Sequence, residues 1–350
     1  TSPATPSIFR TSRVGSALAQ SSTIDTVAFT SPWIRSWSVM RPSAVTLAGT
    51  RAYDGTADFA ASAFGTAGVI ATGIGTETLR LTGSGAVNTT HVAAGVPLTT
   101  TGTLALADGS GLASNYVIAA SGNTGTITAA PLTVSLANTG VTKTYDGTTA
   151  TPAGFTPTYS VSGLVAGDTA ATLTNTGSAY NNAHVANASF VTTSGLVLNG
   201  ITGTKGSATS DYALVSASAN SAAGSASITP ATLSVSLTNT GVTKQYDSTT
   251  AAPAGFTPAY NVSGFVPGDT AATIAHTASA YNDPTVAGAT SLTVSGLSVS
   301  SVTGNNQSLA SDYKVSPTSA SVAARITEAV NSVVQQQQNQ VVDQIFDVVN

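Results

Sequence analysis

The sequence predicts an all-β protein made of three tandem modules and a short carboxyl-terminal helix. Three observations support this prediction: apolar residues alternate with polar ones at a period of two, clusters of Gly, Asn, Asp and Pro separate these runs, and one long segment recurs along the chain. No helical periodicity of useful length appears before residue 326. These features favour strands joined by tight turns over most of the chain.

The internal repeat is clearest in two copies. VSLANTGVTKTYDGTTATPAGFTPTYSVSGLVAGDTAATL begins at Val134, and VSLTNTGVTKQYDSTTAAPAGFTPAYNVSGFVPGDTAATI begins at Val235. A weaker first copy is visible in TRAYDGTADF, at residues 50–59. The expected organisation is a non-repeat lead-in at 1–43, repeats 1, 2 and 3 at 44–130, 131–229 and 230–325, and a carboxyl-terminal segment at 326–350.

The length of the repeat favours independent domains. Solenoid repeats span about 20–50 residues, whereas an immunoglobulin-like sandwich needs about 100, which matches the period here. Within repeat 2, Leu132, Val134 and Leu136 alternate with polar residues, and strand-like runs follow at 158–165, 194–201 and 211–218. Each repeat is therefore expected to form its own immunoglobulin-like β-sandwich.

The two ends of the chain differ from the repeats. Residues 1–43 contain both tryptophans and no repeat signature. From Ile326 onward, apolar residues lie at helical spacings, which predicts an amphipathic helix over 326–350. A single helix is marginal in water, so we expect it to dock on the last repeat or to pair with another chain.

Composition limits the possible functions. Only 7% of the 350 residues are charged, against about 25% in typical domains. The chain is 41% hydrophobic with a net charge of -4, so we expect it to fold, and nucleic acid is an unfavourable partner without a basic face. It has no cysteine and no apolar run long enough to span a bilayer. This composition is typical of exported bacterial surface proteins, and since it starts at Thr1 we expect a fragment or a processed product.

One short motif recurs in all three repeats, a basic residue followed after one position by Tyr-Asp-Gly, with serine replacing glycine in repeat 3. Asp-Gly between strand-like runs signals a hairpin turn, because glycine adopts positive φ without steric cost, and an Asx turn would also accept serine. We therefore expect a structural turn whose tyrosine rings are buried and whose hydroxyls find partners. The motif residues are Tyr53, Asp54 and Gly55, Tyr145, Asp146 and Gly147, and Tyr246, Asp247 and Ser248.

No catalytic set is predicted. His91 and His184 occupy equivalent positions, but repeat 3 has Thr285 there, so a repeated active site is excluded. The only glutamates are Glu77 and Glu328, in different parts of the chain. Surface or turn histidines are favoured, and the chain is expected not to be an enzyme.

Metal, cofactor and covalent-bond sites are also disfavoured. Calcium needs six to eight oxygen ligands, and the aspartates of repeats 2 and 3 are only partly matched in repeat 1, so turn and strand-end aspartates are favoured and neither a metal nor a cofactor is expected. An isopeptide bond from Lys143 or Lys244 is weighed against a solvated lysine, which is favoured because repeat 1 has Arg51. The aspartates are Asp146, Asp168 and Asp211, then Asp247, Asp269 and Asp312, against Asp54, Thr76 and Asn115 in repeat 1.

The recurring motif, together with a later Ser-Asp-Tyr, resembles the YDG repeats of filamentous-haemagglutinin-like adhesins, Gram-negative surface proteins exported by two-partner secretion. The resemblance covers residues 44–326, and the serine of Tyr246-Asp247-Ser248 departs from it. It implies a secreted or surface-attached, non-enzymatic adhesin, located outside the cell, whose repeats form an extended stalk or adhesive rod against a host or neighbouring cell. The alternative is a structural spacer or interaction module with no ligand of its own.

Overall fold

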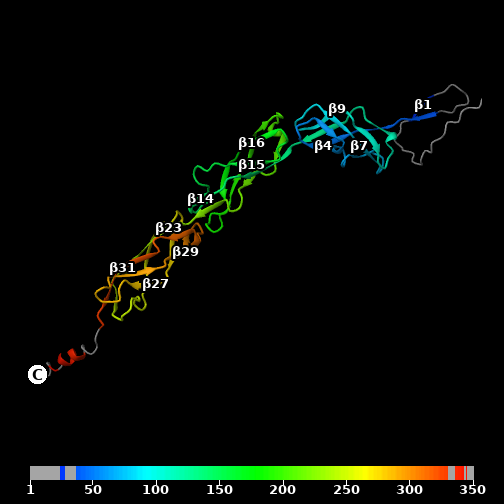
Figure 1. Cartoon of the computed structure of the whole chain (residues 1–350). Helices are drawn as coiled ribbons and strands as arrows, with labels where there is room; N and C mark the ends of the chain where they lie inside the picture. Colours follow the sequence, from blue (N-terminus) through cyan, green and yellow to red (C-terminus); the bar gives the residue numbers. More distant parts are fainter. Residues whose placement is uncertain (1–23, 28–36, 330–335, 343, 345–350) are drawn as a thin grey trace, which may run out of the picture. The chain divides into compact units, whose positions relative to one another are not determined.

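The computed structural model describes residues 24–27, 37–329, 336–342 and 344, and strands dominate its repeats (Figure 1). The prediction of a mostly β protein is confirmed. The runs predicted at 158–165, 194–201 and 211–218 contain β15 (Tyr159–Ser162), most of β19 (Val197–Gly203) and β20 (Tyr212–Leu214).

Repeat 1 is built around a five-stranded sheet with the order β4-β12-β9-β8-β5, beside the three-stranded sheet β10-β7-β6 and the pair β11-β3. Two short 3-10 helices interrupt the strands. The elements are β3 (Ser43–Val45), β4 (Ala48–Ala52), β5 (Asp58–Ala60), η1 (Ala61–Ala63), β6 (Val69–Ala71), β7 (Thr78–Thr82), β8 (Ser84–Val87), β9 (Ala93–Thr100), β10 (Ala105–Asp108), η2 (Ala113–Asn115), β11 (Tyr116–Ile118) and β12 (Thr124–Thr128).

Repeats 2 and 3 share one strand plan, in smaller sheets of two to four strands. Besides β15, β19 and β20, repeat 2 contains β13 (Ala130–Leu136), β14 (Val141–Thr144), β16 (Asp168–Thr174), β17 (Gly177–Tyr180), β18 (Val191–Ser194), η3 (Thr209–Asp211), β21 (Ser218–Asn220) and β22 (Ala226–Thr229). Repeat 3 contains β23 (Ala231–Leu237), β24 (Val242–Gln245), β25 (Tyr260–Ser263), β26 (Asp269–Ala275), β27 (Ala278–Tyr281), β28 (Ser291–Ser295), β29 (Ser298–Gly304), η4 (Ala310–Asp312), β30 (Tyr313–Val315) and β31 (Ser319–Thr327).

Parallel pairs hold the start of each repeat to its end. The first strand pairs with the short strand that follows the late 3-10 helix, as β3 does with β11, β13 with β20 and β23 with β30. The strand before the Tyr-Asp-Gly motif then pairs with the last strand of the repeat, as β4 does with β12, β14 with β22 and β24 with β31. Because parallel neighbours cannot be joined by a tight hairpin, each repeat closes only when most of its length has folded.

Contacts divide the chain into two compact units, and the division passes through repeat 2. Unit 1 comprises Thr1–Val134, Val161–Thr174 and Val197–Ser216, and unit 2 comprises Ser135–Ser160, Asn175–Leu196 and Ala217–Asn350. Unit 1 therefore contains repeat 1 with one part of repeat 2, and unit 2 contains the other part of repeat 2 with repeat 3. That each repeat, with limits near residues 130 and 229, folds as an independent domain remains a prediction.

Apolar clusters follow the same division. One cluster joins the core of repeat 1, including Phe59 and Leu79, to Leu132 and Tyr212 of repeat 2. A second cluster joins Val191 of repeat 2 and its neighbours to residues of repeat 3, and a third fills the interior of repeat 3. Side chains of one repeat thus complete the core of its neighbour within each unit, where burial of an apolar side chain contributes about 1.5–3 kcal/mol.

The chain ends require corrections. Ile326 was expected to begin a helix, but it lies in β31, is 2% exposed and pairs with Lys244, because the alternating pattern of the last strand continues to Thr327. Residues 336–342 are helical, as predicted, with exposed side chains, and residues 330–335 lie outside the described part. In the lead-in, β1 (Ile24–Val27) pairs with β2 (Trp37–Met40). No helix in the described residues is long and apolar enough to cross a membrane.

Candidate functional site

The Tyr-Asp-Gly motif forms a tight bend at the end of the strand that precedes it. Gly55 and Gly147 have φ of 76° and 78°. Asp54 closes the bend, because its Oδ1 accepts the backbone N–H of Thr56 at 2.9 Å and the hydroxyl of Thr56 at 2.7 Å. The motif in this protein is thus an Asx-type bend that needs a left-handed residue at its third position.

The basic residue of the motif is part of this bend. Lys143 Nζ lies 2.7 Å from Asp146 Oδ1 and 2.7 Å from the carbonyl oxygen of Thr148, and its side chain is only 8% exposed. Its ammonium also lies 5.5 Å from the centre of the Tyr180 ring. The expectation of a solvated lysine was wrong, because the folded bend surrounds the ammonium with oxygen atoms and an aromatic ring.

The aspartates of the bend hold a negative charge well. Burial alone would raise the pKa of Asp146, but the ammonium of Lys143 and the N–H and hydroxyl of Thr148 outweigh it and lower that pKa. The hydrogen bonds from Lys244 and Thr249 lower the pKa of Asp247 to about 2. Arg51 and Asp54 form the corresponding pair in repeat 1, at 2.7 Å.

The motif tyrosine reaches into the next repeat. Tyr53 is 3% exposed, and its hydroxyl lies 2.6 Å from Ser207 Oγ. Ser207 donates its single proton to Asp168 Oδ2 at 2.6 Å, so Tyr53 is the donor toward Ser207. Tyr212 packs edge-on against Tyr53, with ring centres 5.6 Å apart, and donates to the same oxygen of Asp168 at 2.6 Å. The Asp168 carboxylate of repeat 2 therefore accepts the hydroxyls of Ser207 and Tyr212, and Ser207 in turn accepts the hydroxyl of Tyr53 of repeat 1.

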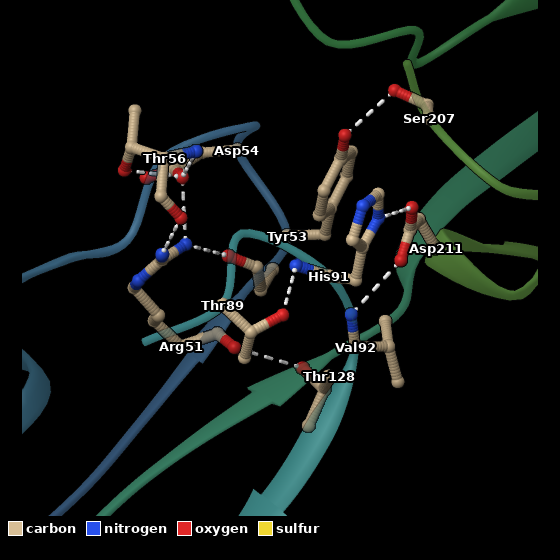
Figure 2. A network of polar contacts seen from close by, with 11 residues as sticks. Arg51, Tyr53, Asp54, Thr56, Thr89, His91, Val92, Thr128, Ser207 and Asp211 are labelled. Atoms are coloured by element: carbon tan, nitrogen blue, oxygen red, sulfur yellow. Dashed lines mark hydrogen bonds and ion pairs between the residues drawn. The ribbon is translucent and has the colours of Figure 1, made fainter. Parts of the chain in front are cut away.

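A histidine makes a second link between the same two repeats (Figure 2). His91 Nδ1 lies 2.7 Å from Oδ2 of Asp211, a carboxylate with no exposed surface. The other oxygen of Asp211 accepts the backbone N–H of Val92 at 2.9 Å, and Oδ2 also accepts the N–H of Ala208. Both oxygens of Asp211 therefore have partners: His91 and Val92 of repeat 1, and Ala208 at the start of its own 3-10 helix in repeat 2. We call this arrangement the first joint.

The second joint, between repeats 2 and 3, has the same chemistry. Its tyrosine–serine and histidine–aspartate distances are 2.5 Å and 2.7 Å, and its tyrosine is 2% exposed. The tyrosine ring also stacks on the histidine ring, with centres 6.4 Å apart. The residues are Tyr145, His184 and Val185 from repeat 2 with Asp269, Ser308, Asp312 and Tyr313 from repeat 3.

Protonation states follow from burial in the joints. Burial, and then the hydrogen bond to Asp168, raise the pKa of Tyr212 to about 12, and the same causes raise the pKa of Tyr313. Burial would raise the pKa of Asp211, but His91 and the backbone N–H groups of Val92 and Ala208 together lower it. At neutral pH the joint thus holds a neutral tyrosine and a charged aspartate.

We call the surface that carries the motif tyrosine the tyrosine face, and the surface that carries the serine and aspartates the aspartate face. The tyrosine face of repeat 3 is uncovered in the described residues. Tyr246 is 43% exposed, against 3% and 2% for Tyr53 and Tyr145, so the expectation of burial was wrong for this copy. The motif alone does not bury its tyrosine; the following repeat does.

Sequence reasoning missed the joint histidines and serines. His91 and His184 occupy equivalent positions, and so do Asp211 and Asp312, one repeat further along the chain. This shared offset was a usable signal, but spacing alone does not show that residues about 120 positions apart are in contact. In repeat 1 the aspartate-face partner of Tyr116 is Glu77 rather than Thr76. The described residues contain no cluster of three or more His, Cys, Asp or Glu side chains suited to a metal.

Comparison with known protein families identifies a family that matches the chain. The family described as the YDG domain matches the chain twice, over residues 38–124 and 128–221, which together cover more than half of its length. The two matches correspond to repeats 1 and 2. No curated protein and no solved structure matches the chain.

Proposed function

Because the chain belongs to the YDG domain family, we propose that it is the non-enzymatic repeat region of a secreted or surface-attached bacterial adhesin, in which the repeats act as an extended stalk or adhesive rod. The parent protein would act outside the cell, against a host or neighbouring cell surface. The proposal involves no nucleic acid, metal or cofactor. It also includes the expectation that each repeat is an immunoglobulin-like sandwich.

The observation that carries the proposal is the recurrence of the joint. The tyrosine–serine and histidine–aspartate pairs appear twice with nearly the same distances, so two successive connections in the chain use one buried polar device. Buried carboxylates that draw partners from two repeats favour one geometry, because any other arrangement leaves more of their oxygens without partners. Asp168 and Asp269 each already hold one buried oxygen, Oδ1, that has no partner. A region that must transmit position from repeat to repeat requires such specificity.

The use of the carboxylates also supports a structural role. Asp54, Asp146 and Asp247 close bends, while Asp211 and Asp312 cap 3-10 helices and bind a histidine of the preceding repeat. These groups are committed to backbone N–H groups and neighbouring side chains, which leaves them poorly suited to proton transfer with a substrate.

Small-angle scattering of the full chain, extrapolated to infinite dilution so that only single chains contribute, tests the stalk. We expect the profile of an elongated particle, and a Tyr145→Ala variant is expected to broaden its distance distribution by loosening the second joint. Tyr246→Ala is the matched control, since its ring meets no following repeat, and it is expected to leave the profile unchanged. A compact particle would contradict the stalk.

Attachment assays separate the adhesin from its alternative, a spacer with no ligand of its own. Beads coated with the full chain should attach to host or bacterial cells more than beads coated with albumin if the repeats are themselves adhesive. Attachment at the albumin level, together with an elongated scattering profile, would favour the spacer. In either case the chain occupies the same place in the parent protein.

A further inference from the structure

Among the described residues, the tyrosine face of repeat 3 is uncovered, whereas the next repeat covers this face in repeats 1 and 2. Tyr246 is 43% exposed and Val286 is 38% exposed. Their equivalents in repeat 1, Tyr53 and Val92, meet Ser207 and Asp211 of the next repeat. A valine and a tyrosine ring exposed together on such a face mark an interaction surface.

A groove extends along this face. It has a volume of about 710 Å³ and is lined by residues that include Val242, Ala289 and Ala324. In repeat 2, the equivalent Val141 and Ala188 belong to an apolar cluster that also contains Phe265 and Val266 of repeat 3. The joints therefore show what this kind of groove accommodates, which is the aspartate face of another repeat.

Two substitutions change the chemistry that this face accepts. Thr285 stands where the other repeats have His91 and His184, so no imidazole is available to pair with an incoming aspartate. Asp283 stands where the others have Thr89 and Asn182, and its Oδ1 accepts the N–H of Thr285 at 2.7 Å. An aspartate placed as Asp211 is would find no imidazole there, and Asp283 adds a negative charge to the same loop, which is unfavourable for it.

One aspartate face in this chain carries the complementary change. In repeat 1, Asn115 stands where repeats 2 and 3 have Asp211 and Asp312, and it is exposed. Its amide oxygen can accept the N–H of Val286, as Asp211 accepts that of Val92, and its neutral side chain adds no negative charge near Asp283. Leu112 and Val117, on either side of it, are 59% and 45% exposed.

A second charge difference favours the same pairing. Arg325 lines the groove and pairs with Thr243 in register, where the other repeats have Thr126 and Ser227. The aspartate face of repeat 1 carries Asp108, which accepts the N–H of Ala113 at the start of its 3-10 helix. An arginine on one face and a carboxylate on the other steer encounter and fix orientation.

We propose that the tyrosine face of repeat 3 binds the aspartate face of repeat 1 in a second copy of this chain, head to tail, through a joint in which the neutral Asn115 takes the place of the aspartate. Gly111 stands at the position of Ser207, so Tyr246 loses its hydroxyl partner and this joint is weaker than those within the chain. Since the two faces are different surfaces, the contact is heterologous and can continue from copy to copy.

Sedimentation of the full chain over a range of concentrations tests the proposal. We expect reversible, concentration-dependent growth of the wild-type chain. Asn115→Asp is expected to weaken association at least tenfold by placing a second carboxylate near Asp283 with no histidine to pair with it. The matched control is Asn220→Asp on an exposed strand of repeat 2, where the side-chain oxygen that accepts from Thr192 is retained, and it is expected to associate as the wild type does.

A rescue variant completes the experiment. Asn115→Asp combined with Thr285→His and Asp283→Asn recreates the histidine–aspartate pair of the internal joints, and association is expected to return. Circular dichroism checks that each variant is folded. We expect all of them to fold, because the changed residues lie on exposed surfaces or in loops. A wild-type chain that stays monomeric at all concentrations overturns the proposal, as does association that Asn115→Asp leaves unchanged or that the triple variant fails to restore.

Discussion

Tyr145 and Tyr246 occupy the same place in the same motif, yet one is 2% and the other 43% exposed. Both follow a lysine that pairs with the next aspartate at 2.7 Å, and both donate a backbone N–H to the last strand of their repeat at 2.8 Å. The local structure is therefore equal. The difference lies in the following repeat, which covers Tyr145 with Ser308 and Tyr313. The motif forms the bend, and the joint adds the burial.

The largest expected difference is between two tyrosine deletions. Tyr145→Ala should lower the free energy of unfolding of its compact unit by about 3 kcal/mol or more, as loss of a large buried ring does. Tyr246→Ala should lower it by less than about 1 kcal/mol, since much of that ring is already exposed. Denaturant melts of both variants measure the contrast. Equal losses would show that the motif, and not the joint, uses the tyrosine.

Removal of the joint histidine should give the next largest effect. His184→Ala leaves the buried carboxylate of Asp312 short of one partner, which should cost about 1–3 kcal/mol. The reverse change, Thr285→His on the tyrosine face of repeat 3, should cost about 1 kcal/mol or less, because it removes only the hydrogen bonds that the exposed Thr285 hydroxyl makes with Asp283 and Gly288 in its own loop. Thermal melts of both variants test this pair. A loss from Thr285→His as large as that from His184→Ala would contradict this contrast.

The third comparison concerns the residue after the motif aspartate. Gly147 has φ of 78°, and a Cβ there would lie 2.9 Å from Asn306 Nδ2, so Gly147→Ser should cost about 1–2 kcal/mol. Ser248 already has φ of 67°, so Ser248→Gly should stabilise by about 0.5–1 kcal/mol. The serine of repeat 3 thus shows that the position after the motif aspartate tolerates a strained residue, and does not show that glycine and serine are equally stable there. Melts that show no change for either variant would contradict this.

Low pH should destabilise the protein by protonating the aspartates of the joints and bends. Folding lowers the pKa of Asp211 below its ordinary 3.8, so the stability it contributes is complete above that pH and is lost as the pH falls through the folded-state value. Asp146 behaves in the same way. Thermal melts between pH 2 and pH 7 should show a falling midpoint below about pH 4. Asp211→Asn should flatten this slope, and an unchanged slope would remove Asp211 as its source.

The smallest expected effect is that of calcium. Most carboxylate oxygens of the bends and joints are held by N–H groups, hydroxyls and cations, and the unpaired Oδ1 atoms of Asp168 and Asp269 belong to no cluster of three or more metal-binding side chains among the described residues. Added calcium or a chelator should therefore leave the melting temperature unchanged. Scanning calorimetry with and without chelator measures this. A shift of several degrees would reveal a site built from the aspartates.

Local features were predictable because they rest on short-range chemistry. Alternation of apolar residues places strands such as β13, and Asp-Gly predicts the bend at residues 54 and 55, since period and positive φ are properties of neighbouring residues. Ile326 shows the limit of this approach. Its spacing to later valines predicts a helix, but pairing with β24 keeps it in a strand.

The joints could not be derived in this way. Tyr53 finds Ser207, and His91 finds Asp211, only after two parallel strand pairs have brought the ends of successive repeats together. The amino-acid order alone is enough for the repeats, the strands and the bends, because these depend on residues a few positions apart. Tertiary structure decides which motif tyrosine is buried, which histidine has a carboxylate and which face stays open, because these depend on contacts between residues more than about 100 positions apart, whose closure entropy is offset only when a whole repeat packs.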